Sequence, residues 1–127
     1  WVRKTSPREA VTALPVLITE GFHKRGLTLT RIAEITSANP AAIFNIYPRK
    51  GALLVGSDAD VAIVDINRVK KVEKDLLRSA SDFSIYEGWS FRGWPVTTIC
   101  RGRVVMQDGE PAGEPGWGRY LERRPLA

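Results

Sequence analysis

The hydrophobic pattern of the chain changes near Gly51, and this change constrains the fold more than any other feature of the sequence. Before Gly51, apolar residues such as Leu29, Ile32 and Ile35 recur at helical spacing, which favours amphipathic helices. After Gly51, short β-rich runs alternate with turn residues, which favours strands. The sequence therefore predicts an α+β fold whose helices precede its strands.

Three helices are predicted in the first part of the chain. Thr12 is expected to cap a helix that ends near Phe22, with Pro15 in its first turn, where the absent N–H costs little. Thr28 is expected to cap a second helix. Asn39-Pro40 is expected to start a third, short helix, because Pro is favoured at the first helical position.

Short apolar or β-branched runs mark the strands of the second part. The predicted strands cover residues 61–66, 96–100 and 103–107. The first of these reads as a buried strand, and a weaker run surrounds Val69 and Val72. The last two flank Arg101-Gly102, a two-residue turn containing Gly, which predicts a β-hairpin. Residues 111–127 are rich in Gly and Pro and are expected to form an extended tail.

Composition limits the class of protein. At 127 residues, with 43% apolar and 26% charged residues, the chain is expected to fold as an ordinary globular domain. The net charge of +5 leaves a small basic binding domain as a minor alternative. However, the basic residues are dispersed beside acidic ones, without the aromatic-and-basic pattern of a nucleic-acid module, so no nucleic-acid partner is expected.

The length of the apolar runs and the number of Cys residues indicate the cell compartment in which the chain is expected. The run Ala13 to Ile18 is too short to span a bilayer, so no membrane association is expected. Cys100 is the only Cys, which excludes a disulfide within the chain. A reducing compartment, the cytoplasm, is therefore the expected location.

Two single residues are candidates for chemistry. His23, the only His, is either a ligand or general base, or an exposed residue at the negative end of a helix, which is the favoured interpretation. Cys100 is either a nucleophile or an inert buried thiol in a strand. The second interpretation is favoured because no local feature stabilises a thiolate.

Asp58 and Asp60 form a pair of carboxylates two residues apart. They could serve acid–base chemistry, but a turn in which Asp58 accepts backbone N–H bonds is favoured. The neighbouring stretch from Gly51 to Gly56 fails as a phosphate loop. Lys50 precedes its first Gly, and no Gly-Lys-Ser/Thr closes it.

Aromatic residues gather in the last third of the chain. The set comprises Phe83, Tyr86, Trp89, Phe91, Trp94, Trp117 and Tyr120. A binding platform is possible, but a contact between subunits or domains is favoured, since Trp and Tyr concentrate at such interfaces. Gly116-Trp117-Gly118-Arg119-Tyr120 is expected to dock through its aromatic side chains.

Four blocks of sequence carry a resemblance to a known family. They are Leu14-Pro15-Val16-Leu17 with Glu20-Gly21; Thr36-Ser37-Ala38-Asn39-Pro40-Ala41; Tyr47-Pro48-Arg49-Lys50-Gly51 with Gly56-Ser57-Asp58-Ala59-Asp60; and Gly93-Trp94-Pro95-Val96, Arg101-Gly102 and Asp108-Gly109, ending in Pro115-Gly116-Trp117-Gly118-Arg119. Together they resemble the end of a metal-dependent cyclic amidohydrolase of the dihydropyrimidinase and hydantoinase type. The Gly-Ser-Asp-Ala-Asp block occurs across amidohydrolases, whereas Tyr-Pro-Arg-Lys-Gly and Gly-Trp-Pro narrow the resemblance to this branch.

The resemblance implies a parent enzyme with a (β/α)₈ TIM barrel and a small β-sandwich. Residues 1–50 would be the C-terminal helices of the barrel, 51–110 the C-terminal strands of the sandwich, and 111–127 an extended tail. Such enzymes hydrolyse the amide C–N bond of small cyclic imides or diamides with two divalent metal ions, usually zinc. They are commonly homotetramers, and the tail often packs on a neighbouring subunit.

The resemblance also implies where the chemistry is not. It places the metal-ligating His residues, the bridging Lys and the catalytic Asp upstream of Trp1, in the rest of the parent chain. We therefore expect no catalytic, substrate-binding or metal-binding residue in this chain, and no activity from it alone. Trp1 opens the chain and Met106 is its only Met, which also leads us to expect a longer protein.

One stretch departs from the family pattern. An Asn-Gly-x-Pro-Gly-x-Glu loop that helps hold the substrate in the family aligns with residues 5–11, where Thr5 replaces the Asn and Val11 replaces the Glu. Substrate contact by Thr5 or Ser6 is thus only weakly indicated. Non-catalytic relatives act in cytoskeletal regulation, so a non-catalytic scaffold or assembly module is the alternative function.

Overall fold

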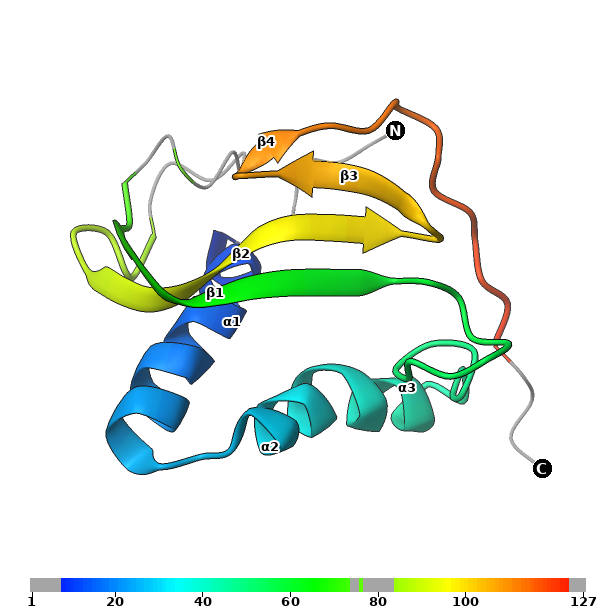
Figure 1. Cartoon of the computed structure of the whole chain (residues 1–127), viewed down its shortest axis with the longest axis horizontal. Coiled ribbons are helices and arrows are strands. Elements are labelled where there is room, and N and C mark those ends of the chain that lie inside the picture. The colour runs from blue at the N-terminus through cyan, green and yellow to red at the C-terminus, as the bar shows by residue number, and fades with distance from the viewer. Residues whose placement is uncertain (1–7, 74–75, 77–83, 124–127) are drawn as a thin grey trace. The chain divides into compact units, whose positions relative to one another are not determined.

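The computed structural model describes residues 8–73, 76 and 84–123 and has the predicted α+β organisation, with helices first and strands after them (Figure 1). The elements are α1 (Arg8–Val16), η1 (Leu17–His23), α2 (Leu29–Ala33), η2 (Glu34–Ala38), α3 (Asn39–Ile43), β1 (Val61–Lys71), β2 (Ser90–Cys100), β3 (Arg103–Gln107) and β4 (Glu110–Pro111). The two η segments are π-helical. The strands form one sheet in the order β1-β2-β3-β4. In the described part, no helix is long and apolar enough to cross a membrane.

The chain divides into two compact units, each of which combines helix and strand. The first comprises Trp1–Leu27 and Val64–Pro95, and the second comprises Thr28–Ile63 and Val96–Ala127. The division into segments 1–50, 51–110 and 111–127 stays a prediction. Thr5, Ser6 and Phe83 lie outside the described residues.

The first helix of the chain begins earlier than predicted. α1 starts at Arg8, so Thr12 is a fully buried interior residue and not the cap. Pro15 therefore lies inside the helix, near its end, and not in the first turn. The helical path continues past Pro15 into π-helical η1, which begins two residues later.

An apolar cluster forms the core of the first unit. Val72, Phe91 and Trp94 are each at most 4% exposed, and Val16, Leu76 and Tyr86 pack against them. The Trp94 Nε1–H donates to the Phe91 carbonyl at 2.8 Å, so the buried indole is satisfied.

The η1 segment is joined to β2 in the same unit by a reciprocal contact. Thr19 Oγ1 donates to the Arg92 carbonyl at 2.9 Å and accepts from the Arg92 N–H at 2.8 Å. Beside this contact Gly93 has a φ of +102°, and a Cβ there would lie 2.2 Å from Ile18 Cγ2. Gly is therefore required at this position, both for its backbone conformation and for the approach of Ile18.

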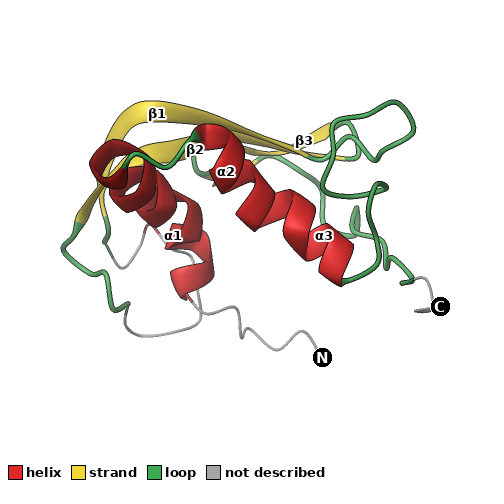
Figure 2. Cartoon of the chain, turned by 90° about the horizontal axis from the view of Figure 1, so that it is seen from below, coloured by secondary structure: helices red, strands yellow, loops and turns green. Residues whose placement is uncertain are grey.

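The second unit contains one helical rod built from α2, η2 and α3, which Figure 2 shows running on without a break. Thr28 caps it as predicted, since its side chain accepts from the Arg31 N–H at 3.1 Å. The short helix predicted from Asn39-Pro40 is present as α3, with Pro40 in its first turn. The predicted fresh cap is wrong, because Asn39 has helical φ and ψ and α3 continues η2. The carbonyl of Thr36, one turn before Pro40, lies in π-helical η2, whose wider turn accommodates the proline ring and the absent N–H.

The strands are longer than predicted. β1 is a single strand of 11 residues that joins the two expected runs. It is not the buried strand expected, since half-buried and exposed positions alternate along most of it and Val69 is 62% exposed. β2 begins at Ser90 and not at Val96. The stretch Gly93-Trp94-Pro95 disfavours a strand locally, but tertiary packing holds it in the sheet.

The hairpin predicted at Arg101-Gly102 is confirmed. β2 and β3 pair antiparallel with Cys100 opposite Arg103, and a bulge follows Thr98. Arg101 has a φ of +46° and Gly102 a φ of +78°, as a type I′ turn requires. A second turn at Asp108-Gly109 joins β3 to the short β4.

Candidate functional site

The loop that follows α3 in the second unit carries a dense set of polar contacts. The peptide bond between Tyr47 and Pro48 is cis. Gly51, at φ +81°, lies so close to α3 that a Cβ would be 2.6 Å from the Ala41 Cβ. Farther on, Ser57 Oγ donates to the Pro48 carbonyl at 2.6 Å. The loop is thus folded back on itself.

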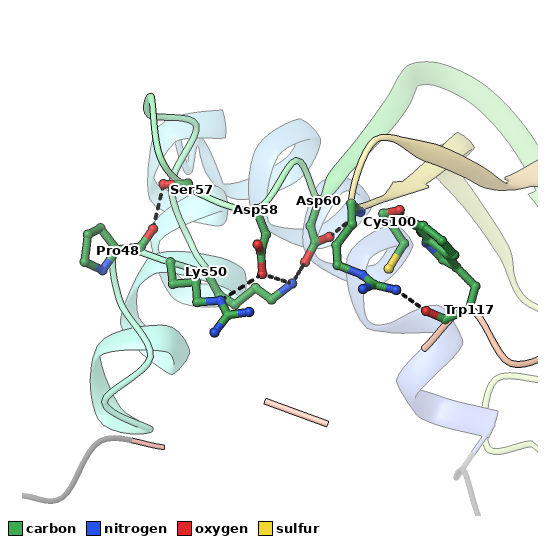
Figure 3. A network of polar contacts seen from close by, with 9 residues as sticks. Pro48, Lys50, Ser57, Asp58, Asp60, Cys100 and Trp117 are labelled. Carbon is green, nitrogen blue, oxygen red and sulfur yellow. Dashed lines mark hydrogen bonds and ion pairs between the residues drawn. The ribbon is translucent and has the colours of Figure 1, made fainter. Parts of the chain in front are cut away.

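Lys50 is the centre of this set (Figure 3). Its Nζ lies 2.9 Å from Asp58 Oδ2 and also binds Asp60 Oδ2. Burial disfavours the charge on Lys50, but the hydrogen bonds to Asp60 and Asp58 outweigh burial and raise the pKa of Lys50. Arg49, which is more exposed, adds a contact of 3.3 Å from Nε to Asp58 Oδ2.

The same contacts shift the two carboxyl groups in the opposite direction. The hydrogen bond from Lys50 lowers the pKa of Asp58. For Asp60, burial acts to raise the pKa, but hydrogen bonds from Lys50 and from the Arg101 N–H outweigh burial and lower it. Both carboxyl groups are therefore held ionised by a neighbouring cation, which suits a structural ion-pair network and not a general acid.

The network ties the loop to the β2–β3 hairpin turn. Asp60 Oδ1 accepts from the Arg101 N–H at 2.8 Å, and the Gly102 N–H donates to the Ala59 carbonyl at 3.0 Å. The expected acceptor of a backbone N–H is Asp58, whereas the structure gives this role to Asp60, whose donor is the distant Arg101. A long-range partner in the turn, which no local pattern reveals, decides between them.

Trp117 fixes the tail on the same hairpin. Its Nε1–H donates to the Cys100 carbonyl at 2.9 Å, and its carbonyl accepts from the Arg101 guanidinium. The guanidinium carbons of Arg101 and Arg103 lie 4.3 and 4.0 Å from the ring centroid. Beside it, β3 and the tail from Ala112 line a shallow groove of about 360 Å³. The tail segment docks through an aromatic side chain, as expected.

The two single candidates occupy structural positions. His23 ends η1 as predicted but is half-buried, and its Nε2 lies 2.8 Å from the Ile66 carbonyl. Because a carbonyl can only accept, this nitrogen carries the proton and links η1 to β1. Cys100 is a free thiol at the end of β2, as predicted, but it is half-buried and not buried.

The aromatic residues of the last third do not form one platform. Phe91 and Trp94 belong to the core of the first unit, so the predicted interface role is wrong for them. Tyr86 contacts Phe91 edge-to-face with 5.4 Å between ring centroids. Trp89 is 55% and Tyr120 is 91% exposed, so these two remain at the surface. Val16, which packs against this core from a distant part of the sequence, explains the difference.

The donor set does not fit a metal centre. Among the described residues, no group of three or more His, Cys, Asp and Glu side chains is placed to hold a metal ion. The His23 Nε2 faces a carbonyl, and Asp58 and Asp60 are engaged by Lys50. Sequence reasoning missed the role of Lys50. The signal in the sequence was that Lys50 lies close to two carboxylates, Asp58 and Asp60, in a loop whose Pro48 and Gly51 favour turns.

Comparisons with known proteins place the chain. The sequence pattern of the family described as "Amidohydrolase family" matches residues 9–105. The chain is 42% identical over 113 residues to the L-hydantoinase of Paenarthrobacter aurescens, covering 89% of this chain and 25% of that protein. It is 40% identical over 112 residues to dihydropyrimidinase 2 of Caenorhabditis briggsae, covering 88% and 22%.

A solved structure agrees with the sequence relatives. The solved structure of the L-hydantoinase from Arthrobacter aurescens superposes with a TM-score of 0.82 at 42% identity, covering 87% of this chain and 24% of that one. The chain thus spans about a quarter of the length of the relatives it matches. Since the family pattern covers most of the chain, these residues belong to the amidohydrolase family, in its dihydropyrimidinase and hydantoinase branch.

Proposed function

We propose that this chain is the C-terminal segment of a metal-dependent cyclic amidohydrolase that hydrolyses the amide C–N bond of cyclic imides or diamides. The observation that carries the proposal is the 42% identity to an L-hydantoinase over 113 residues. Relatives that are named dihydropyrimidinase and D-hydantoinase support the same reaction class. Within that enzyme, the helical part belongs to the barrel, and the strands belong to the β-sandwich.

The chain's own residues supply architecture to that enzyme. The two divalent metal ions that the family uses would polarise the amide carbonyl and lower the pKa of a bound water. The described residues do not fit those metal ions, so the ligands belong to the rest of the parent chain. Lys50 instead fastens the loop after α3 to the hairpin turn, through Asp58 and Asp60. We therefore assign this chain a structural role: it provides a rigid surface on which the metal-binding part of the parent enzyme packs.

The same proposal extends to assembly and location. We propose a homotetramer in the cytoplasm, with a small cyclic amide as substrate. The docked Trp117 and the exposed Tyr120 farther along the tail support a tail that contributes to subunit contacts. Size-exclusion chromatography with light scattering on the complete protein tests this assembly.

A chimera tests the reaction class. This chain replaces the segment that it matches in the L-hydantoinase of Paenarthrobacter aurescens, and turnover of hydantoin and dihydrouracil is measured together with metal content. We expect two bound metal ions and turnover from the chimera, and neither from the 127-residue chain alone. Turnover by the isolated chain would contradict the placement of the catalytic centre elsewhere.

A non-catalytic scaffold is the second candidate, and one observation favours it. Val11 stands where the family loop has Glu, and in the structure it is a 45% exposed residue of α1. A folded chimera that binds two metal ions but turns over no cyclic amide supports the scaffold. If Val11→Glu restores turnover, the loss of turnover is due to this position, and the enzyme function is favoured over the scaffold.

A further inference from the structure

The loop after α3 exposes an uninterrupted apolar triplet. Leu53 is 75%, Leu54 58% and Val55 fully exposed. The same unit exposes Ile43 by 75% and Phe44 by 52%, at the end of α3. Single exposed apolar residues are ordinary on protein surfaces, but consecutive ones on one loop indicate a contact surface.

The triplet is presented by a fixed frame. The Ser57 N–H donates to the Leu54 carbonyl at 3.0 Å, and Gly56 between them has a φ of +94°, which is the geometry of a type II turn. On either side, Gly51 is packed on α3, and Asp58 is bound by Lys50. Val55 therefore stands at the tip of a turn whose two ends are both tied down.

The triplet and its immediate neighbours carry no charge. No charged residue lies between Gly51 and Ser57. Next to this stretch, Lys50 is paired with Asp58 and Asp60, so the nearest cation is neutralised within the loop. An apolar surface without charge fits a complementary apolar protein surface and not a nucleic acid or an anionic membrane.

We propose that Leu53, Leu54 and Val55 form the surface on which the remaining part of the amidohydrolase chain packs. The occupant follows from length, because this chain covers only 24–25% of the hydantoinases it matches. The triplet also lies inside residues 9–105, the part shared with the family. The inference rests on the proposed function and adds the surface by which the two parts of that enzyme are joined.

Thiol labelling tests this contact without relying on activity. Leu54→Cys is introduced in a Cys100→Ala background, into both the 127-residue chain and the hydantoinase chimera, and the rate of maleimide labelling is measured. We expect rapid labelling in the isolated chain and a labelling rate at least about tenfold lower in the chimera, because the site becomes buried. Lys24→Cys is the matched control: Lys24 carries a charge and its side chain is 60% exposed, so the thiol should label equally fast in both.

The outcomes separate this inference from the proposed function. Rapid labelling of the Leu54→Cys thiol in a chimera that turns over hydantoin overturns the docking surface and leaves the proposed function standing. A protected thiol in a chimera without turnover supports the docking surface while the proposed function fails. Protection that grows with concentration of the isolated chain identifies a second copy as occupant and overturns the proposal. Hydrogen exchange over residues 51–57 of the unsubstituted proteins repeats the comparison without any mutation.

Discussion

The two units of the molecule are stabilised in different ways. In the first unit, Val72, Phe91 and Trp94 form a dry apolar cluster, and Ile18 is also only 2% exposed. In the second unit, Ile32 is the only large apolar side chain that is buried among the described residues. The second unit is instead held by polar contacts around Lys50 and the hairpin turn.

This difference predicts different responses to mutation and to pH. Burial of apolar area contributes about 25 cal/mol per Å² and does not depend on protonation. Ion pairs near the surface contribute less, and they depend on pH and on salt. The first unit should therefore respond most to loss of volume, and the second to loss of charge.

The largest effect should come from emptying the core of the first unit. Phe91 is 1% exposed, so Phe91→Ala removes a buried ring and leaves a cavity. We expect it to lower the free energy of unfolding by about 3–5 kcal/mol, measured by urea denaturation. Val69→Ala, on the 62% exposed side of β1, is the control and should change stability by less than about 0.5 kcal/mol. Equal effects of the two substitutions would show that the cluster is not a core.

The next largest effect tests the close approach of η1 to β2. Gly93→Ala would place a Cβ 2.2 Å from Ile18 Cγ2 at a φ of +102°. Overpacking and the unfavourable φ together should cost about 2–4 kcal/mol. Gly88→Ala is the matched control, because Gly88 also has a positive φ, of +83°, but has nothing within 4 Å of an added Cβ. The difference between the two variants in thermal midpoint isolates the cost of the contact with Ile18.

Features set by neighbouring residues could be predicted from the sequence. The Thr28 cap and the Arg101-Gly102 hairpin depend on two to four consecutive residues, and both are confirmed. The prolines were misjudged for a related reason. Local rules place Pro15 and Pro40 at helix starts. Pro40 does lie in the first turn of α3, but α3 continues π-helical η2 without a new cap, and Pro15 lies near the end of α1. Such a change of helix type carries no signal in a window of a few residues.

Features set by distant residues could not be predicted in the same way. Phe91 and Trp94 were assigned to a surface because nothing in their neighbourhood shows that Val16 and Val72 cover them. Likewise, Asp58 and Asp60 were seen as a pair, but their shared cation Lys50 was not. The sequence thus predicts that polar residues gather around Asp58 and Asp60. It does not predict the hydrogen-bonded network, because Lys50 and the hairpin turn come together with these residues only after folding.

A smaller effect should come from removing the cation of the second unit. Lys50→Met removes the cation that Asp58 and Asp60 share, leaving Asp58 with the more exposed Arg49 and Asp60 with the Arg101 N–H. The thermal midpoint at neutral pH should therefore fall by a few degrees. Lys24→Met is the control, because Lys24 forms a pair of 2.5 Å with Glu20 but is 60% exposed. It should have a smaller effect, since exposed pairs contribute little. Equal losses from the two variants would mean that the Lys50 network is an ordinary surface pair.

The pH dependence of the same variant gives an independent measurement. The pKa values of Asp58 and Asp60 are lowered on folding, so their contribution is complete above about pH 4, the unfolded value, and is lost as pH falls through the folded pKa values. The pKa of Lys50 is raised, so its contribution is complete below about pH 10 and is lost as pH rises through the folded pKa. The difference in stability between the wild type and Lys50→Met should therefore shrink at both extremes. A difference that stays constant from pH 3 to pH 7 would refute the assignment.

The smallest effect concerns the anchor of the tail. Trp117→Phe keeps an aromatic ring between Arg101 and Arg103 but removes the Nε1–H that donates to the Cys100 carbonyl at 2.9 Å. Loss of one hydrogen bond should weaken docking of the tail by about 1 kcal/mol while leaving global unfolding nearly unchanged. Limited trypsin digestion at Arg119 measures this directly, because cleavage follows the fraction of undocked tail, and a cost of that size corresponds to roughly fivefold faster cleavage. Tyr120→Phe keeps the 91% exposed ring without its hydroxyl and should leave the cleavage rate unchanged. If both variants are cleaved at the wild-type rate, Trp117 does not restrain the tail, and the second unit is held by the Lys50 network without it.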